Sequence, residues 1–294
     1  MRYATGAALV ILAGAVWSVQ GLIIRNIHEA GSWVVLFWRS VGMVPVLLAW
    51  IAVQSGGRVW PEVRAVGFAG VIGGMGLVAA FGGAIFALQA TTVANAMLLF
   101  TASPFFAALL GWLILKEHVS RATWGAIALA IIGVLLMVRE GVATGAVAGN
   151  VAALISALGF ATFTITLRWG KLSNMLPAVV LGAFFSIAAG AAVSAMQGAT
   201  LAVPLVEIGI SAAMGAVTLT GGMVLYTLGS RVVPAAQATL LSLVEVLLGP
   251  LWVWALLGET VSSATLIGGA VLLVAVVLNA LIGAKERAAA PVLA

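Results

Sequence analysis

Charged side chains are scarce in this sequence and cysteine is missing altogether. Charged residues make up 7% of the 294 residues, against about 25% in typical soluble domains. The lack of cysteine excludes disulfides and thiolate chemistry. Aspartate is also missing and there are only two histidines, which leaves too few ligands for a metal site. No cofactor is therefore expected, and a soluble catalytic domain is excluded.

The sequence is instead filled by ten apolar stretches. Each is close to the length of about 20 residues that a helix needs to cross hydrocarbon. Because the bilayer core has no water to satisfy backbone groups, each stretch should be helical. The sequence thus predicts an all-α integral membrane protein with ten transmembrane helices. The predicted spans are Thr5–Ile24, Trp33–Val53, Ala65–Ala87, Thr91–Leu115, Ala122–Val138, Gly149–Leu167, Pro177–Ala195, Val206–Leu228, Pro234–Leu257 and Ala264–Ile282.

The basic residues predict the orientation of these spans. With a cytoplasmic N-terminus, ten arginine and lysine residues fall in cytoplasmic segments and only Arg25 and Arg139 in external ones. This bias follows the positive-inside rule and places both the N- and the C-terminus in the cytoplasm. The ten are Arg2, Arg58, Arg64, Lys116, Arg121, Arg168, Lys171, Arg231, Lys285 and Arg287.

The two halves of the sequence match each other. A repeated unit with an odd number of spans must insert its second copy upside down. The match therefore predicts two inverted five-helix repeats, residues 1–140 and 141–294, an architecture in which secondary transporters bind substrate between the halves. An offset of 142 pairs Glu117 with Glu259, Ala94 with Ala236, Ala96 with Ala238 and Ser120 with Ser262, and an offset of 143 pairs Gly6 with Gly149 and Arg25 with Arg168.

The repeated motif resembles the EamA family of the drug/metabolite transporter superfamily. In each half, small residues near a helix start are followed by a glutamate at the helix end, within Leu115-Lys116-Glu117 and Leu257-Gly258-Glu259. The resemblance implies a multi-pass protein of the bacterial inner membrane that moves small metabolites. Bacterial amino-acid exporters of the YddG type are a branch that fits.

Glu245 is the residue that points most directly to function. It lies at the centre of the ninth predicted span, where a carboxylate costs about 2.5–3.5 kcal/mol on insertion scales. The offset of 142 pairs Glu245 with Ser103 and Gln237 with Asn95. We expect these four side chains to converge at the pseudo-twofold axis and bind substrate, with Glu245 holding an ammonium group or a proton. The alternative is a structural glutamate bonded to a neighbouring helix.

Aromatic side chains are predicted to complete the binding site. They would form a wall for a flat apolar group, and the alternative is that they pack or face lipid. The predicted wall, with one glutamine, is Trp17, Gln20, Phe81, Phe160, Phe163 and Tyr226.

Prolines and one arginine inside the spans have further predicted roles. Proline removes a backbone hydrogen bond and bends a helix, so Pro104 and Pro250 are predicted hinges. Arg39 lies six residues after Trp33, the predicted start of the second span. Its position favours a side chain that snorkels to the outer headgroups, and the alternative is a partner for a substrate carboxylate.

These features together predict a secondary transporter that works by alternating access. An exporter of amino acids, including hydrophobic or aromatic ones, is preferred. The alternatives are efflux of cationic drugs or of other metabolites, while a channel or membrane enzyme lacks the charge rings or polar clusters it needs. The expected partners are a small-molecule substrate and the lipid bilayer, with no nucleic acid. The sequence leaves the oligomeric state open, and a monomer is compatible with it.

Overall fold

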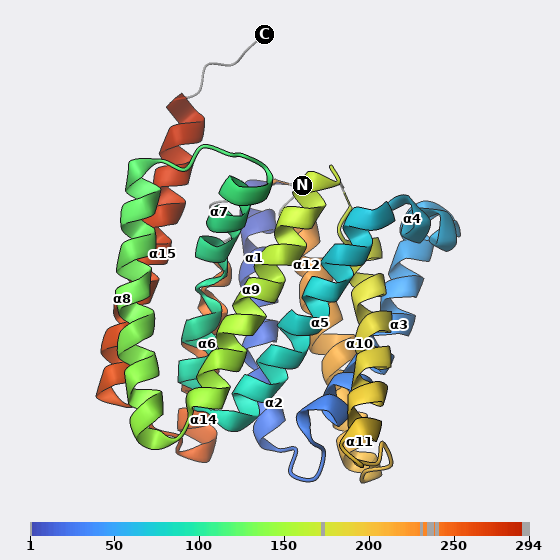
Figure 1. Ribbon diagram of the computed structural model, residues 1–294. Helices are drawn as coiled ribbons and strands as arrows, with labels where there is room; N and C mark the ends of the chain where they lie inside the picture. Colours follow the sequence, from blue (N-terminus) through green and yellow to red (C-terminus); the bar gives the residue numbers. More distant parts are fainter. Residues whose placement is uncertain (1, 172–173, 230–231, 234–237, 239–240, 290–294) are drawn as a thin grey trace.

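The structure, a computed structural model, describes residues 2–171, 174–229, 232–233, 238 and 241–289. Within these residues the secondary structure is helical throughout, without a strand, and the helices run side by side between two ends of the molecule (Figure 1). Nine of the described helices are long and apolar enough to cross a membrane, and α14 is a shorter apolar helix. The prediction of a ten-helix, all-α membrane protein is confirmed.

The helices follow the predicted spans closely. The first half contains α1 (Tyr3–Ser18), α2 (Gln20–Arg25), α3 (Ser32–Ser55), α4 (Val59–Ala65), α5 (Gly67–Ala90), α6 (Val93–Phe100), α7 (Ser103–Ile114) and α8 (Arg121–Thr144). The second half contains α9 (Val147–Trp169), α10 (Leu176–Met196), α11 (Leu205–Ala213), the π-helix η1 (Met214–Leu219), α12 (Thr220–Gly229), α14 (Val244–Leu257) and α15 (Ser263–Ala289).

Three local features differ from the prediction. The short helix α4 occupies residues that were expected to form a loop before the third span, which was predicted to begin at Ala65. The helix α8 continues six residues beyond the predicted end at Val138, which places Arg139 inside a helix. The eighth span contains the π-helical segment η1. Wide turns of this kind are frequent at functional sites, and hydrophobic periodicity does not reveal them.

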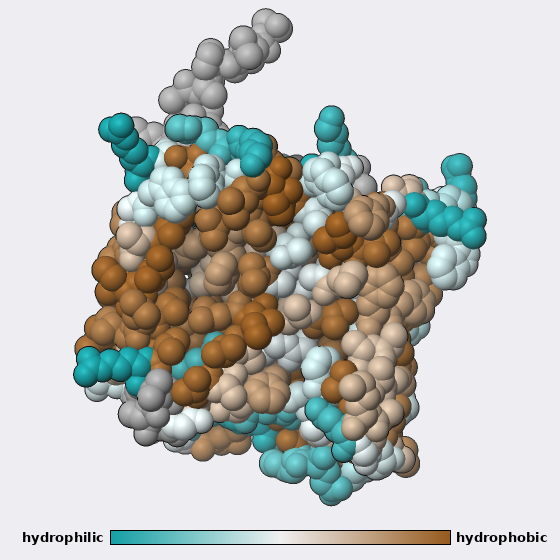
Figure 2. All heavy atoms as spheres, in the orientation of Figure 1, coloured by the Kyte–Doolittle hydropathy of each residue, from teal (hydrophilic) through white to brown (hydrophobic). Residues whose placement is uncertain are grey.

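The two ends of the molecule can be told apart by the loops and termini that lie there. We call the end that holds residues 26–31, between α2 and α3, the outer end, and the opposite end the inner end. The start of α1 and the end of α15 both lie at the inner end, at the top of Figure 1, as an even number of spans requires. Figure 2 shows apolar side chains across the middle of one face and hydrophilic ones at the two ends, the pattern of a protein surrounded by lipid.

The fourth and ninth spans are both interrupted. A turn at Thr101 and Ala102 separates α6 from α7, and a turn at Leu243 precedes α14. The offset of 142 places Thr101 on Leu243, so the breaks occupy equivalent positions in the two halves. Broken helices at equivalent positions are typical of transporters built from inverted repeats.

The ends of these two spans also share their backbone geometry. Lys116 and Gly258 are both left-handed, with φ of 56° and 70°. In each half the N–H of the following glutamate donates to a carbonyl oxygen, of Gly111 or Val253, at 3.2 Å. All of these residues correspond under the offset of 142. The shared geometry supports the proposed division into repeats at residues 1–140 and 141–294.

Small residues allow helices from the two halves to cross closely. At the crossing of α8 and α15, a Cβ atom on Gly133 would lie 2.6 Å from the carbonyl oxygen of Gly268, and one on Gly268 would lie 2.7 Å from that of Gly133. Any larger residue at either position would separate the helices. Close approach through small residues is the usual packing of membrane helices.

The predicted orientation is testable because the chain has no native cysteine to interfere with labelling. A cysteine at Asn26 or Glu29, in the outer segment, should react with a membrane-impermeant maleimide in intact cells. A cysteine at Glu62 or His118 should react only after the membrane is opened. The opposite pattern would show that the charge bias assigns the wrong side.

Candidate functional site

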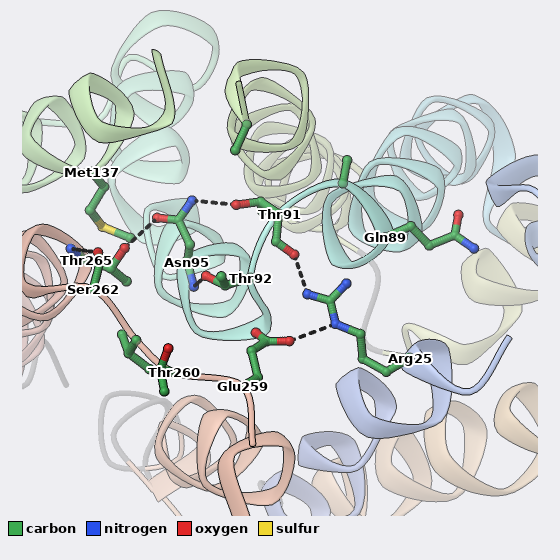
Figure 3. A pocket seen from close by; sticks show the side chains of 13 residues that line it. Arg25, Gln89, Thr91, Thr92, Asn95, Met137, Glu259, Thr260, Ser262 and Thr265 are labelled. Atoms are coloured by element: carbon green, nitrogen blue, oxygen red, sulfur yellow. Dashed lines mark hydrogen bonds and ion pairs between the residues drawn. The ribbon is translucent and has the colours of Figure 1, made fainter. Parts of the chain in front are cut away.

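A cavity of about 550 Å³ lies at the outer end of the molecule. Figure 3 shows that polar side chains from several helices point into it. They come from α2, from the start of α6 with the segment before it, and from the segment that joins α14 to α15. Both halves of the chain therefore contribute to its wall.

An ion pair between the halves crosses this cavity. Glu259 accepts a hydrogen bond from Arg25 Nε at 2.8 Å and another from the backbone N–H of Val93 at 2.6 Å. Arg25 Nη2 also donates to the carbonyl oxygen of Thr91 at 2.6 Å. The carboxylate thus binds an arginine of the first half and the N-terminus of α6, where negative charge is favoured. The Arg25 and Glu259 side chains are 24% and 18% exposed.

A second ion pair joins the halves elsewhere in the molecule. Arg168, at the end of α9, donates to Glu117, which follows α7. The offsets that match the repeats place Arg25 on Arg168 and Glu259 on Glu117, so each pair joins an arginine of one half to a glutamate of the other. This second pair lies at the inner end and is more exposed, 54% for the arginine and 38% for the glutamate. Solvent and salt therefore screen it more strongly.

A buried glutamate also joins the two halves at the outer end, through the segment of residues 26–31 that we call the outer segment. Glu207, in the first turn of α11, accepts hydrogen bonds from the backbone N–H groups of His28, Glu29 and Ala30 at 2.9, 3.1 and 2.8 Å. The carboxylate is buried and is compensated by these three donors. A glutamate of the second half therefore fixes the outer segment of the first.

Asn95 lies beside the outer cavity, buried with an exposed fraction of 5%. Its Nδ2 donates to Thr91 Oγ1 at 3.1 Å and to Asn150 Oδ1, and its Oδ1 accepts from Thr265 Oγ1 at 3.5 Å. Sequence reasoning did not select Asn150, which is fully buried at the start of α9. The amide connects α6, α9 and α15, and its role in substrate binding stays a prediction.

The predicted convergence of four polar residues does not occur between Asn95 and Glu245. Asn95 is in the first turn of α6 at the outer end, whereas Glu245 is twelve residues before the end of α14, or about 18 Å of helix. Spans that are inverted copies carry equivalent residues to opposite ends unless those residues lie at the centre. Gln237 lies outside the described residues.

Glu245 and Ser103 do occupy equivalent central positions. Ser103 is the first residue of α7, and Glu245 is in the first turn of α14, each directly after a helix break. A helix N-terminus favours a carboxylate. The first span lies close by, because a Cβ atom on Gly14 would be 2.6 Å from Val244 Cγ1 and 3.5 Å from the backbone nitrogen of Glu245.

The two predicted hinge prolines have different surroundings. Pro104 lies in the first turn of α7, directly after the break, where its missing N–H is tolerated. Pro250 lies inside α14, which continues through it, and the break of the ninth span is at Leu243 instead. The hinge role of both prolines stays a prediction.

The structure assembles only part of the predicted aromatic wall. The rings of Trp17 and Tyr226 are in tilted contact with centroids 5.7 Å apart, and Trp17 Nε1 donates to the carbonyl oxygen of Leu219 at 3.4 Å. Phe160 instead projects from the outside of α9 and is 43% exposed, while Phe163 is buried against α5. The two residues are three positions apart on one helix, which makes them neighbours on its surface, and their ring centroids lie 6.0 Å apart. Gln20, at the start of α2, is half-buried.

Arg39 does not snorkel, and that prediction is wrong. The side chain is 2% exposed, and its guanidinium carbon lies 4.8 Å from the centre of the Phe81 ring. The turn of α3 at Arg39 packs against η1, where a Cβ atom on Gly215 would overlap the carbonyl oxygen of Arg39. An arginine inside the bilayer costs about 2.5–3.5 kcal/mol on insertion scales. A desolvated cation–π contact returns about 2 kcal/mol of this.

Comparison with known proteins finds a family that matches the first half of the chain. Residues 4–139 match the EamA-like transporter family. The protein is a membrane transporter whose first half is similar to this family. It is a multi-pass protein of the bacterial inner membrane and moves small metabolites.

Two curated relatives and one solved structure align with almost the whole chain. The pseudopaline exporters CntI of Pseudomonas aeruginosa strains UCBPP-PA14 and PAO1 are each 25% identical over 282 residues, which cover 92% of this chain and 94% of theirs. One crystal structure aligns with 96% of this transporter and 99% of its own chain, with a TM-score of 0.63 and 16% identity. That structural likeness supports the fold alone.

Proposed function

We propose that this transporter exports amino acids, including hydrophobic and aromatic ones, by alternating access between two inverted repeats. The observation that carries the proposal is the pair of equivalent ion pairs, Arg25–Glu259 and Arg168–Glu117, at opposite ends of the molecule. Each joins the two halves. A substrate path between the halves has to open at one end at a time, and each pair is placed to close one end. Export is the direction named for the two curated relatives.

In this proposal the outer end is closed in the present conformation. Glu259 holds Arg25 and the start of α6, and Glu207 holds the outer segment. Release of substrate to the outside requires the Glu259 contacts to break. Because these contacts are few and partly exposed to solvent, they can exchange for water during the cycle.

Glu245 supplies the charge that binds the substrate's ammonium group. It lies in a broken helix near the middle of the membrane, close to the first span that also carries Trp17. Desolvating an ammonium group is tolerable only where a paired group compensates. The carboxylate should therefore select zwitterions or cations over free anions, and the Trp17–Tyr226 ring pair should favour apolar side chains.

Purified protein in liposomes tests this selectivity. Uptake of phenylalanine, methionine and threonine is compared with uptake of aspartate and of a quaternary-ammonium dye, with empty liposomes as the control. We expect phenylalanine and methionine to be preferred. Preference for aspartate would contradict the electrostatic argument, and transport of the dye without any amino acid would establish cationic efflux instead.

A further inference from the structure

Arg39 is a buried charge that the proposed mechanism does not yet use. It lies seven residues into α3, about 10 Å from the outer end of that helix. The ion pairs formed among the described residues are those of Arg25 and Arg168, so Arg39 has no described counter-ion. Charged side chains inside a membrane are costly and mark substrate paths as a rule.

The atoms of Arg39 that lack partners form one binding edge. Nε and Nη2 are both buried without a hydrogen-bond partner among the described residues. These two nitrogens point their N–H groups from the same edge of the planar guanidinium, in the spacing that matches the two oxygens of a carboxylate. The guanidinium carbon lies over the Phe81 ring, 4.8 Å from its centre, and this contact leaves the Nε and Nη2 donors without a hydrogen-bond acceptor in the described part of the chain.

The location of Arg39 fits a substrate path. The helix α3 belongs to the first half and packs against α11 and η1 of the second half. Transporters built from inverted repeats bind substrate between their halves. The π-helical turn of η1 lies directly against the backbone of Arg39, and such turns often mark functional sites.

We propose that Arg39 binds the carboxylate of the transported substrate, so that the substrates are metabolites that carry a carboxylate as well as an amine. The inference rests on the proposed function and adds a second recognition element to it. Glu245 selects for the ammonium group and Arg39 for the carboxylate. An amine without a carboxylate would leave the Nε and Nη2 donors unpaired and is therefore a poor substrate.

The test compares phenylalanine with phenylalaninamide, which keeps the ammonium group and the ring but has no carboxylate. In liposomes, wild-type protein should prefer phenylalanine. Arg39→Gln should raise the KM for phenylalanine by about tenfold or more and leave that for phenylalaninamide unchanged. Arg39→Lys keeps the charge without the two-pronged edge and should fall between. The matched control is Arg58→Gln, at an exposed arginine before α4, which should behave as wild type.

A binding measurement separates this inference from the proposed function. Thermal stabilisation of the detergent-solubilised protein by each compound is measured for the same variants. Phenylalanine should stabilise the wild type more than phenylalaninamide does, and Arg39→Gln should remove this difference. That outcome supports the role of Arg39 even if amino acids are not transported. Lack of amino-acid transport would overturn the proposed function alone. Three outcomes would overturn the role of Arg39. Arg39→Gln could lose stabilisation by both compounds equally, it could keep the wild-type preference for phenylalanine, or the wild type could show no such preference.

Discussion

Glu245→Gln is expected to lower amino-acid transport by about a hundredfold or more. The substitution keeps the size of the side chain and removes its negative charge. Removing one partner of a buried ion pair costs about 3–5 kcal/mol, because the other charge is left uncompensated, and every 1.4 kcal/mol corresponds to about tenfold. Here the uncompensated charge would be the substrate's ammonium group. Initial rates of phenylalanine uptake into liposomes measure the effect.

The control for this result is Glu62→Gln, in α4, away from the helix breaks. It makes the same chemical change and should transport normally. Expression level and gel-filtration profile of both variants show whether folding is retained. Normal transport by Glu245→Gln at every pH would show that Glu245 is neither a substrate ligand nor a proton carrier, and that it has the structural role left open by the sequence.

The helices were predictable because their signal is strong and local. The stretch that became α3 needs only its length and hydropathy to be recognised, and the structure moves its ends by one or two residues. The break at Leu243 carries no such signal, because no glycine or proline stands there. Only its correspondence to the turn before Pro104, in the other half of the sequence, indicates a break there.

The ion pairs at the two ends were harder to predict because their residues come from different helices. Arg25, Arg168, Glu117 and Glu259 were all matched between the repeats, but they were not paired with each other. The proposed inversion of the second repeat explains how they pair. The outer end of the first span and the outer end of the ninth span meet on the same side of the membrane, so an arginine of one copy faces a glutamate of the other.

Arg39 shows where sequence reasoning gave the wrong answer. Its distance from the end of α3 is compatible with a side chain that reaches the headgroups. The side chain is buried because Phe81 covers it and because Gly215 allows η1 to pack tightly against the same turn. Both contacts join residues far apart in the sequence, and no local pattern encodes them.

The second large effect is expected from reversing the charge of Arg25. Arg25→Glu places a second carboxylate beside Glu259, and repulsion between the two should open the outer end. A protein that no longer closes at one end cannot alternate, so phenylalanine transport should fall by about tenfold, equivalent to 1.4 kcal/mol. The equivalent change Arg168→Glu should have a smaller effect, because that pair is more exposed and exposed pairs contribute little.

A charge-exchanged protein distinguishes closure of the outer end from other consequences of Arg25→Glu. Arg25→Glu combined with Glu259→Arg restores opposite charges and should regain part of the transport. Recovery stays partial because an arginine at position 259 cannot accept the hydrogen bond from the N–H of Val93.

Val261→Cys, on the cavity wall, reports the opening of the outer end directly. Its labelling by an impermeant maleimide should rise with Arg25→Glu and fall again in the exchanged protein. Unchanged labelling in the single variant would contradict the role of this ion pair as the outer closure.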